Sequence, residues 1–197
     1  MSSSKLNSFV SGFAVFGFAA AIHLGVVTPA SALSLSCKGL GSPSFSATRT
    51  TESKLRGTTK SKVYVTKSGE REETRRGSGV DVRIVSAKAT YIFNESRGDG
   101  IILPKPKRPR GPKGSKISSE RVGKNTVLTE FIPSQNGGVV AGSKITCSPR
   151  GVPLEHQFIV PTKSNKLDVI TIKHTNIRLG SQSKKLFQPP KSIKFKK

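Results

Sequence analysis

Hydrophobic and polar positions alternate in short runs along much of this chain. Val80, Val82 and Ile84 take every second place in one such run, which is the period of a half-buried β-strand. No window repeats apolar residues at helical spacing for more than two turns. The pattern predicts strands in residues 62–66, 80–85, 89–93, 101–103, 126–132, 139–147, 157–160, 167–173 and 177–179.

Clusters of Gly, Asn, Ser and Pro separate these runs and indicate turns. Asn136-Gly137-Gly138 stands between two strand-like runs and predicts a hairpin with a short loop. Ser164-Asn165 similarly predicts a turn into the strand at 167–173. Many short strands joined by turns are typical of an antiparallel β-sandwich or barrel. We therefore expect an all-β fold.

Three stretches fit this pattern less well. Residues 45–62 are rich in Ser, Thr and Lys, which predicts a loop or a weak edge strand. Residues 69–79, GEREETRRGSG, carry mixed charges and end in glycines, which predicts an exposed hairpin tip. Leu33, Leu35 and Cys37 alternate with polar residues and predict a first strand.

The N-terminus has the layout of a secretory signal peptide. Lys5 precedes an apolar run at 9–27, and a small-residue A-x-A sequence ends at Ala32. The run is close to the roughly 20 residues that a membrane span needs, so an uncleaved anchor is the alternative. Because the run is rich in Ala, Gly and Ser and a cleavage sequence follows directly, we expect cleavage after residue 32. No transmembrane span is then expected in the mature, exported protein, which would be periplasmic or extracellular.

The chain has two cysteines, Cys37 and Cys147. Lipidation of Cys37 is an alternative, but the position three residues earlier is Ser34 rather than a Leu-like residue. An exported protein occupies an oxidising compartment, where two cysteines permit a single pairing. A Cys37–Cys147 disulfide would close a loop of roughly 110 residues and stabilise the fold by about 4–5 kcal/mol. We expect this disulfide.

Positive charge dominates the composition. The chain has 34 Lys and Arg against 11 Asp and Glu, and removal of Lys5 with the leader leaves 33 against 11, a net charge of +22. Such a protein attracts polyanions. Outside the cytoplasm these are anionic lipid, lipopolysaccharide, acidic polysaccharide and extracellular nucleic acid.

Two basic segments concentrate this charge. The proline-rich segment 103–116 contains no acid and cannot lie inside a sheet, so it predicts an extended, solvated loop. The C-terminal tail 184–197 interleaves lysines with Phe187, Ile193 and Phe195, a composition that suits an anionic membrane surface. Solubility of a loop and a frayed terminus are the alternatives. The polyanion-binding residues predicted in the two segments are Lys105, Lys107, Arg108, Arg110, Lys113, Lys116, Lys184, Lys185, Lys191, Lys194, Lys196 and Lys197.

Catalytic and metal-binding motifs are missing from the sequence. There is no G-x-S-x-G, no H-E-x-x-H and no Gly-rich phosphate loop before a helix. Glu72 and Glu73 are adjacent, so in a strand they would face opposite sides. His156 and His174 have no ligand spacing to each other or to the cysteines. We expect no catalytic residue, no metal and no cofactor.

Together these observations predict a signal peptide at 1–32, an all-β domain at 33–183 and a basic tail at 184–197. The function they favour is non-catalytic binding of an anionic envelope component or another polyanion. A structural or protein-interaction module, whose lysines serve solubility, is the alternative from a second class. An enzyme acting on an anionic polymer is a third, and it would need an acidic or His pair in a basic cleft.

Overall fold

The computed structural model describes residues 35–41, 43–104, 115–133, 139–161 and 167–196. The predicted signal peptide and most of segment 103–116 lie outside these residues. No helix in the described residues has the length and hydropathy needed to cross a membrane. The elements are η2 (Cys37–Leu40), β1 (Phe45–Ser53), β2 (Gly57–Val65), β3 (Glu70–Arg76), β4 (Gly79–Val85), β5 (Ala89–Asn94), β6 (Asp99–Pro104), β7 (Lys116–Val122), β8 (Asn125–Pro133), β9 (Val139–Cys147), β10 (Pro153–Pro161), β11 (Leu167–Leu179), η3 (Lys184–Phe187) and β12 (Lys194–Lys196).

Twelve strands form one sheet in the order β12-β6-β5-β4-β3-β2-β1-β11-β10-β9-β8-β7. Every neighbouring pair is antiparallel except β12 and β6, which run parallel. The prediction of an all-β, antiparallel fold of short strands is confirmed, and each strand predicted from residue 62 onward overlaps an observed one. The hairpin predicted around Asn136 is also confirmed, because β8 pairs with β9. The residues of the turn predicted at Ser164-Asn165 lie outside those described.

Two of the sequence predictions are wrong in the middle of the sheet. Residues 45–62, expected as a loop or weak edge strand, form β1 and most of β2. Of residues 69–79, expected as an exposed hairpin tip, residues 70–76 form β3, and only 77–78 form the exposed turn to β4. Both regions contain more polar residues than a buried strand usually has. Charged side chains are accommodated in β3 because they form ion pairs; the buried Arg71 pairs with Glu73 on the same strand and with Glu95 just after β5. Ion pairing therefore replaces apolar packing in this part of the sheet.

The N-terminal end of the described chain also differs from expectation. Cys37 lies in the 3-10 helix η2 rather than in a strand. The Cys37–Cys147 disulfide is confirmed and ties η2 to the end of β9. Leu35 and Cys37 are buried with Ile145 and Cys147, and Leu128 packs against them. The alternation of Leu35 and Cys37 with polar residues therefore predicted their burial correctly. It predicted the wrong backbone structure, because the disulfide and the packing hold a 3-10 helix here rather than a strand.

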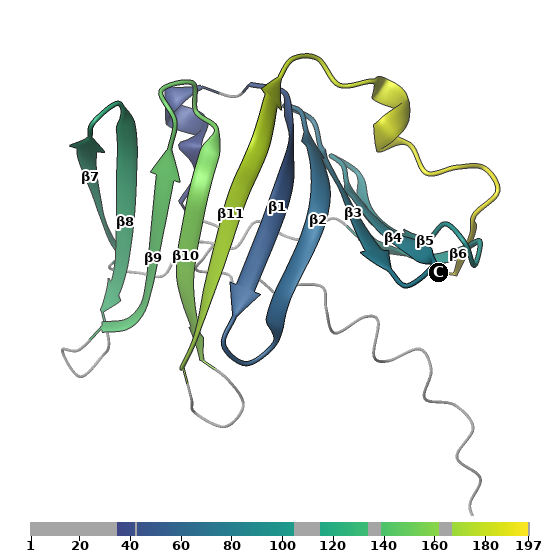
Figure 1. Cartoon of the computed structure of the whole chain (residues 1–197), viewed down its shortest axis with the longest axis horizontal. Helices are drawn as coiled ribbons and strands as arrows, with labels where there is room; N and C mark the ends of the chain where they lie inside the picture. Colours follow the sequence, from purple (N-terminus) through teal and green to yellow (C-terminus); the bar gives the residue numbers. More distant parts are fainter. Residues whose placement is uncertain (1–34, 42, 105–114, 134–138, 162–166, 197) are drawn as a thin grey trace, which may run out of the picture.

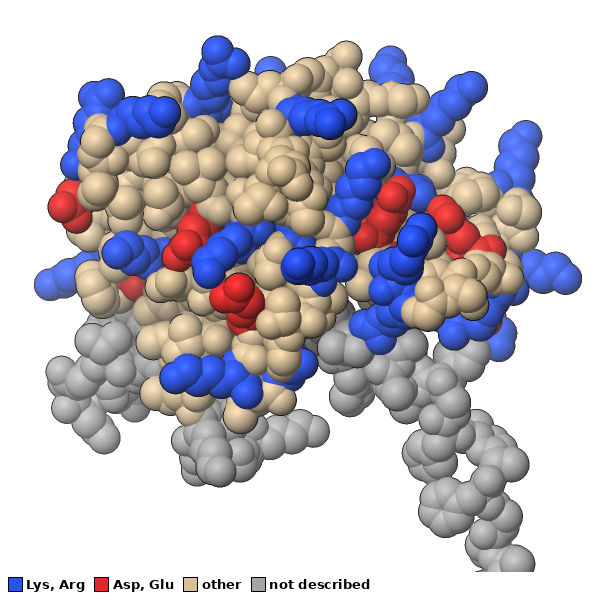
Figure 2. Space-filling view, viewed as in Figure 1, with Lys and Arg blue, Asp and Glu red and all other residues tan. Residues whose placement is uncertain are grey.

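Side chains of a strand alternate between the two faces of the sheet. We call the face that carries Lys62 and Tyr64 the front face, and the face that carries Val63 and Ile145 the back face. Figure 2 looks onto the front face, where Lys and Arg outnumber Asp and Glu. η2 lies on the back face, because its disulfide joins Cys147 there. In Figure 1, β3–β6 turn away from the plane of the other strands, so the sheet is strongly bent.

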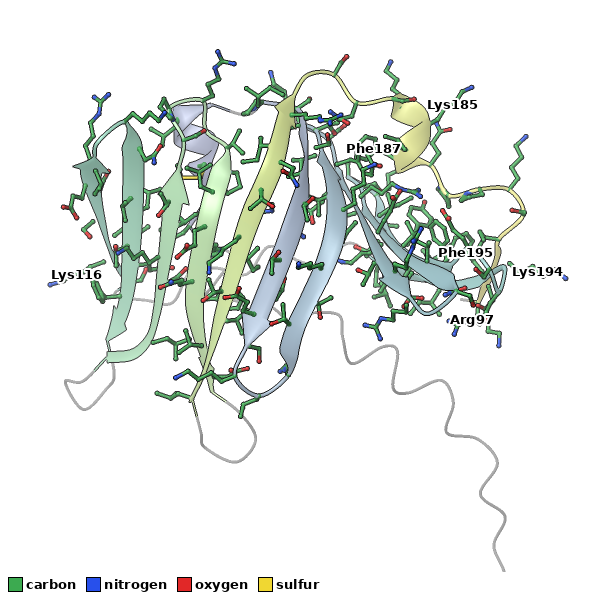
Figure 3. The ribbon with its side chains drawn as sticks, in the orientation of Figure 1. Arg97, Lys116, Lys185, Phe187, Lys194 and Phe195 are labelled. Atoms are coloured by element: carbon green, nitrogen blue, oxygen red, sulfur yellow. A yellow bond between two sulfur atoms is a disulfide. The ribbon has the colours of Figure 1, made fainter. Side chains whose placement is uncertain are left out.

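The C-terminal segment covers the front face of β4–β6. Phe187 and Phe195 pack against a cluster of Val82, Ile84, Phe93 and Ile193 (Figure 3). Phe195 also contacts the rings of Phe93 and Tyr91 edge-on. Gly100 makes room for it, because a Cβ at that position would lie 2.9 Å from the Phe195 ring and 2.6 Å from the Ile92 carbonyl oxygen. The tail is thus anchored by its apolar residues, and it adds β12 to the sheet.

Candidate functional site

A groove with a volume of about 610 Å³ opens on the front face over β1, β2 and β11 and extends to β3 and β4. Four cations line it: Lys60 and Lys62 from β2, Arg75 from β3 and Arg178 from β11. All four side chains are exposed to solvent. Because four exposed cations converge on one groove, we take it as the candidate binding site.

Strand alternation and register bring these cations to the same face. Lys60 and Lys62 stand two positions apart on β2, so both point forward, about 7 Å from each other along the strand. Lys62 lies opposite Thr48 of β1 and Glu73 of β3. Arg178 lies opposite Ser46, one strand further on. Small hydroxyl side chains on β1 thus form the floor between cations on β2 and β11.

A β-bulge shapes the end of the groove that β11 contributes. The register between β1 and β11 shifts between Ser46, which faces Arg178, and Thr48, which faces Thr175. The extra residue lies on β11, where Asn176 lines the groove with a positive φ of 52°. Asn tolerates this left-handed conformation better than most residues. Because bulges bend a strand and redirect side chains, this one sets the position of Asn176 and Arg178 over the floor.

The groove is electrostatically positive. In the described residues, none of the four cations forms an ion pair with a carboxylate. Glu73, the acid in the lining, accepts a hydrogen bond from Arg71 Nε at 2.6 Å, which balances part of its charge, because Arg71 also pairs with Glu95. A side-chain hydrogen bond with Tyr64 raises the pKa of Lys62, whose Nζ lies 5.1 Å from the centre of the Tyr64 ring. Lys62 is therefore fully charged at neutral pH.

The charges on the back face are arranged differently. Arg49 Nη1 lies 2.9 Å from Glu70 and 3.2 Å from Glu72, and its Nε donates to His174 Nε2 at 3.1 Å. Burial alone would raise the pKa of Glu70, but the Arg49 charge outweighs it and brings the value to about 2. Burial would also lower the pKa of Arg49, and its two carboxylates reverse that shift. This cluster is internally neutralised and leaves little charge for a ligand.

One Ser–His pair lies on the back face. Ser143 Oγ and His156 Nε2 are 2.7 Å apart. Burial lowers the pKa of His156 to about 4, and Ser143 is itself buried. No carboxylate bonded to the His156 ring is found in the described part of the chain. A buried serine with such a weak base is poorly suited to nucleophilic catalysis, and we interpret the pair as mutual hydrogen-bond satisfaction.

In the described residues, the lysines predicted to bind polyanions do not form one surface. The predicted residues from Lys105 to Lys113, and Lys197, lie outside the described residues. Lys116 begins β7, at one edge of the sheet, whereas Lys185 and Lys194 lie at the other end of the molecule (Figure 3). Eleven strand spacings separate β7 from β12, or about 50 Å along the sheet. Any polyanion contact by these lysines would thus involve two distant places. The remaining predicted residues, Lys184, Lys191 and Lys196, accompany Lys185 and Lys194 in the C-terminal segment.

The sequence prediction missed the groove cations. The alternation of Lys60, Lys62 and Tyr64 was a usable signal, because it places two cations and an aromatic ring on one face of a strand. The contributions of Arg75 and Arg178 could not be foreseen, because they depend on strand order. As for metals, the described residues contain no group of three His, Cys, Asp or Glu side chains that could hold an ion.

Solved structures that resemble this one include the following two. An uncharacterized conserved protein from Thermus thermophilus superposes with a TM-score of 0.54 and 13% sequence identity, over 81% of this chain and 93% of that chain. A LolA superfamily protein from Nitrosomonas europaea superposes with a TM-score of 0.43 and 9% identity, over 79% of this chain and 98% of that chain. No protein-family model and no curated protein matches the sequence. At these identities, the likeness concerns the fold alone.

Proposed function

We propose that this protein is exported and binds, without catalysis, a ligand that carries phosphate, sulfate or carboxylate groups in the front-face groove. The observation that carries this proposal is the convergence of Lys60, Lys62, Arg75 and Arg178 on one groove, with no carboxylate paired to any of them in the described residues. Cations that already have a partner gain little from a ligand, whereas these four gain charge-assisted hydrogen bonds.

The dimensions of the groove favour a compact charged group. A volume of about 610 Å³ is within the range of small-molecule sites, roughly 300–1,000 Å³. Ser46, Thr48 and Asn176 supply neutral donors beside the cations. Two lysines about 7 Å apart can bind neighbouring charged groups of one ligand. The headgroup of an anionic lipid or lipopolysaccharide, or one unit of an acidic polysaccharide or nucleic acid, meets these requirements.

Export of the protein is supported by its disulfide and by the leader-like N-terminus. Cys37 and Cys147 are paired, and disulfides of this kind persist in oxidising compartments. The anionic components of a cell envelope are found in the same compartments. Binding is favoured over catalysis because the exposed cations lie in front, whereas the Ser143–His156 pair and the Arg49 cluster behind are internally satisfied.

Inorganic pyrophosphate is a suitable probe, because it presents two charged groups without any carrier. We expect it to shift the backbone amide resonances of residues 46–48, 60–64 and 176–178, with an affinity that falls as salt is added. Lys60→Gln combined with Lys62→Gln should weaken binding by about tenfold or more, since each lost charge-assisted bond contributes about 1.5–3 kcal/mol before screening.

Lys144→Gln is the matched control, because Lys144 is an exposed front-face lysine on β9 outside the groove. It removes one positive charge and should leave the affinity nearly unchanged. Equal losses in the control and in either single groove variant would show that net charge, rather than the groove, attracts the anion. Shifts confined to residues 184–196 would move the site to the C-terminal segment.

A further inference from the structure

Large apolar side chains are exposed at one end of the strands. Leu167 (62% exposed) and Val169 begin β11, Phe131 (48%) lies near the end of β8, and Ile117 (57%) lies near the start of β7. Leu55 (56%) lies in the turn between β1 and β2. Because these strands alternate in direction, all five positions lie at the same end of the sheet, the lower end in Figure 1. We call this set, with Lys54, Arg56 and Lys116, the lower rim.

The pairing register joins part of the rim into a row on the front face. Lys116 lies opposite Phe131, and Phe131 lies opposite Gly142. On the next pair of strands, Ile159 lies opposite Val169. Gly142 carries no side chain, so the row is apolar from β8 to β11 and is bounded by a lysine at β7. Part of the rim is therefore an apolar row on the front face, whereas Ile117, opposite Glu130, lies on the back face and Leu55 lies in the turn between β1 and β2.

The charged groups exposed on this rim are positive. Lys54, Arg56 and Lys116 are all exposed. Of the nearby acids, Asp168 and Glu130 are buried, and Asp168 accepts a hydrogen bond from Ser53 Oγ at 2.7 Å. Glu52 lies 3.3 Å from Lys173 Nζ, which balances its charge. Within the described residues, the lower rim therefore combines exposed apolar side chains with cations that form no ion pair.

We propose that the lower rim docks this protein, edge-on, to an anionic membrane surface. Exposed apolar strips with a cationic border mark interaction surfaces. Apolar side chains enter the boundary between headgroups and acyl chains, and each cation near an anionic surface increases partitioning by about fivefold. A second copy of the chain is a poor occupant, because a net charge of +23 opposes self-association. An anionic bilayer instead neutralises that charge.

This surface is separate from the groove. Val169 lies at the lower end of β11 and Arg178 near its upper end, roughly 30 Å away at the rise of an extended strand. Lys60, at the other end of the groove, lies three residues after the start of β2, so a protein docked through its rim would hold the Arg178 end of the groove clear of the bilayer and the Lys60 end closer to it. The proposal therefore stands independently of the groove's ligand, and the two can fail separately.

Vesicle flotation tests the proposal. We expect the mature protein, residues 33–197, to float with phosphatidylcholine vesicles that contain about 30% phosphatidylglycerol. With vesicles of pure phosphatidylcholine it should remain in solution. Leu55→Ser combined with Leu167→Ser should reduce partitioning by about tenfold or more. Val122→Ser combined with Leu179→Ser is the matched control, because both residues are exposed apolar positions at the opposite strand ends, and it should change partitioning by less than twofold.

A fluorescent variant gives a positive signal that does not depend on loss of binding. The chain contains no Trp, so Leu167→Trp introduces a single reporter on the rim. Its emission should shift to shorter wavelength with anionic vesicles and not with neutral ones, whereas Leu179→Trp should show no shift.

Three results would overturn the proposal: equal flotation of the rim variant and the wild type, equal losses in the rim variant and its control, or an unshifted Leu167→Trp emission. The proposal would also be overturned if Lys60→Gln combined with Lys62→Gln abolished flotation while the rim variant did not. That result would mean that the groove binds the lipid headgroup. Loss of pyrophosphate binding in that groove variant with flotation unchanged would support both proposals.

Discussion

The two faces of the sheet carry charged residues in different arrangements. On the back face, Arg49 is enclosed by Glu70 and Glu72, and its Nε donates to His174. On the front face, Lys62 and Arg178 border a groove and pair with no carboxylate in the described residues. Both faces belong to the same strands, β1, β2 and β11.

This difference indicates that charged residues on the back face serve stability, whereas those on the front face are available for binding. A buried ion cluster keeps its shape because the loss of one member leaves the others unpaired in a poorly solvated place. Exposed cations without partners contribute little to stability, but they are available to a ligand. We therefore expect changes on the back face to alter stability, and changes on the front face to alter binding.

The largest effect is expected at the disulfide, which fastens η2 over the back face. Replacing both Cys37 and Cys147 by Ala should lower the free energy of unfolding by about 4–5 kcal/mol, because the bridge closes a loop of 110 residues. Urea unfolding monitored by circular dichroism measures this. A loss below about 1 kcal/mol would mean that η2 contributes little to the back face.

A smaller loss is expected from the ion cluster itself. Arg49→Met should lower the free energy of unfolding by about 3 kcal/mol, since it leaves Glu70 and Glu72 only the longer contacts with Arg83, at 3.9 and 3.6 Å. Arg178→Met is the matched control on the front face of the same strand pair. It should change stability by less than about 0.5 kcal/mol while weakening pyrophosphate binding. Equal destabilisation by the two variants would remove the distinction between the faces.

The smallest effect per residue is a pH dependence that belongs to the back face. Burial lowers the pKa of His156 to about 4; burial and the Arg49 charge lower that of His174 to about 4. Between pH 6.5 and 4 the unfolded chain therefore binds protons that the native chain does not, so stability falls as the pH falls. The loss is up to about 2 kcal/mol per histidine at pH 5.

Thermal unfolding at pH 7, 6 and 5 measures this dependence. His156→Gln removes one titrating group and should reduce the slope by about half. The stability that Glu70 contributes has a different window, because its pKa of about 2 lies below the unfolded value; it is lost as the pH falls from about 4.5 to about 2. A melting temperature that is constant from pH 7 to 5 would contradict the assignment of both histidines.

The candidate site was only partly predictable from sequence. The predicted polyanion-binding segments have their charges close together in the sequence. In the structure, however, Lys116 and Lys194 lie at opposite edges of the sheet. The groove cations come from three strands between residues 60 and 178, and none of them belongs to a basic run. Their convergence depends on register, including the bulge at Asn176, which no local pattern specifies.

Most of the described strands, the hairpin between β8 and β9 and the disulfide could be predicted from the sequence. Alternation with a period of two is a local property, and two cysteines in an oxidising compartment have one possible pairing. Tertiary structure decided which strands are central. The sequence of β3 is typical of a charged hairpin tip, but in the structure Arg83 of the neighbouring β4, and Arg49 of β1 on the far side of β2, form ion pairs with Glu70 and Glu72. It also decided which cations are left unpaired, because pairing depends on the side chains that strand order brings together.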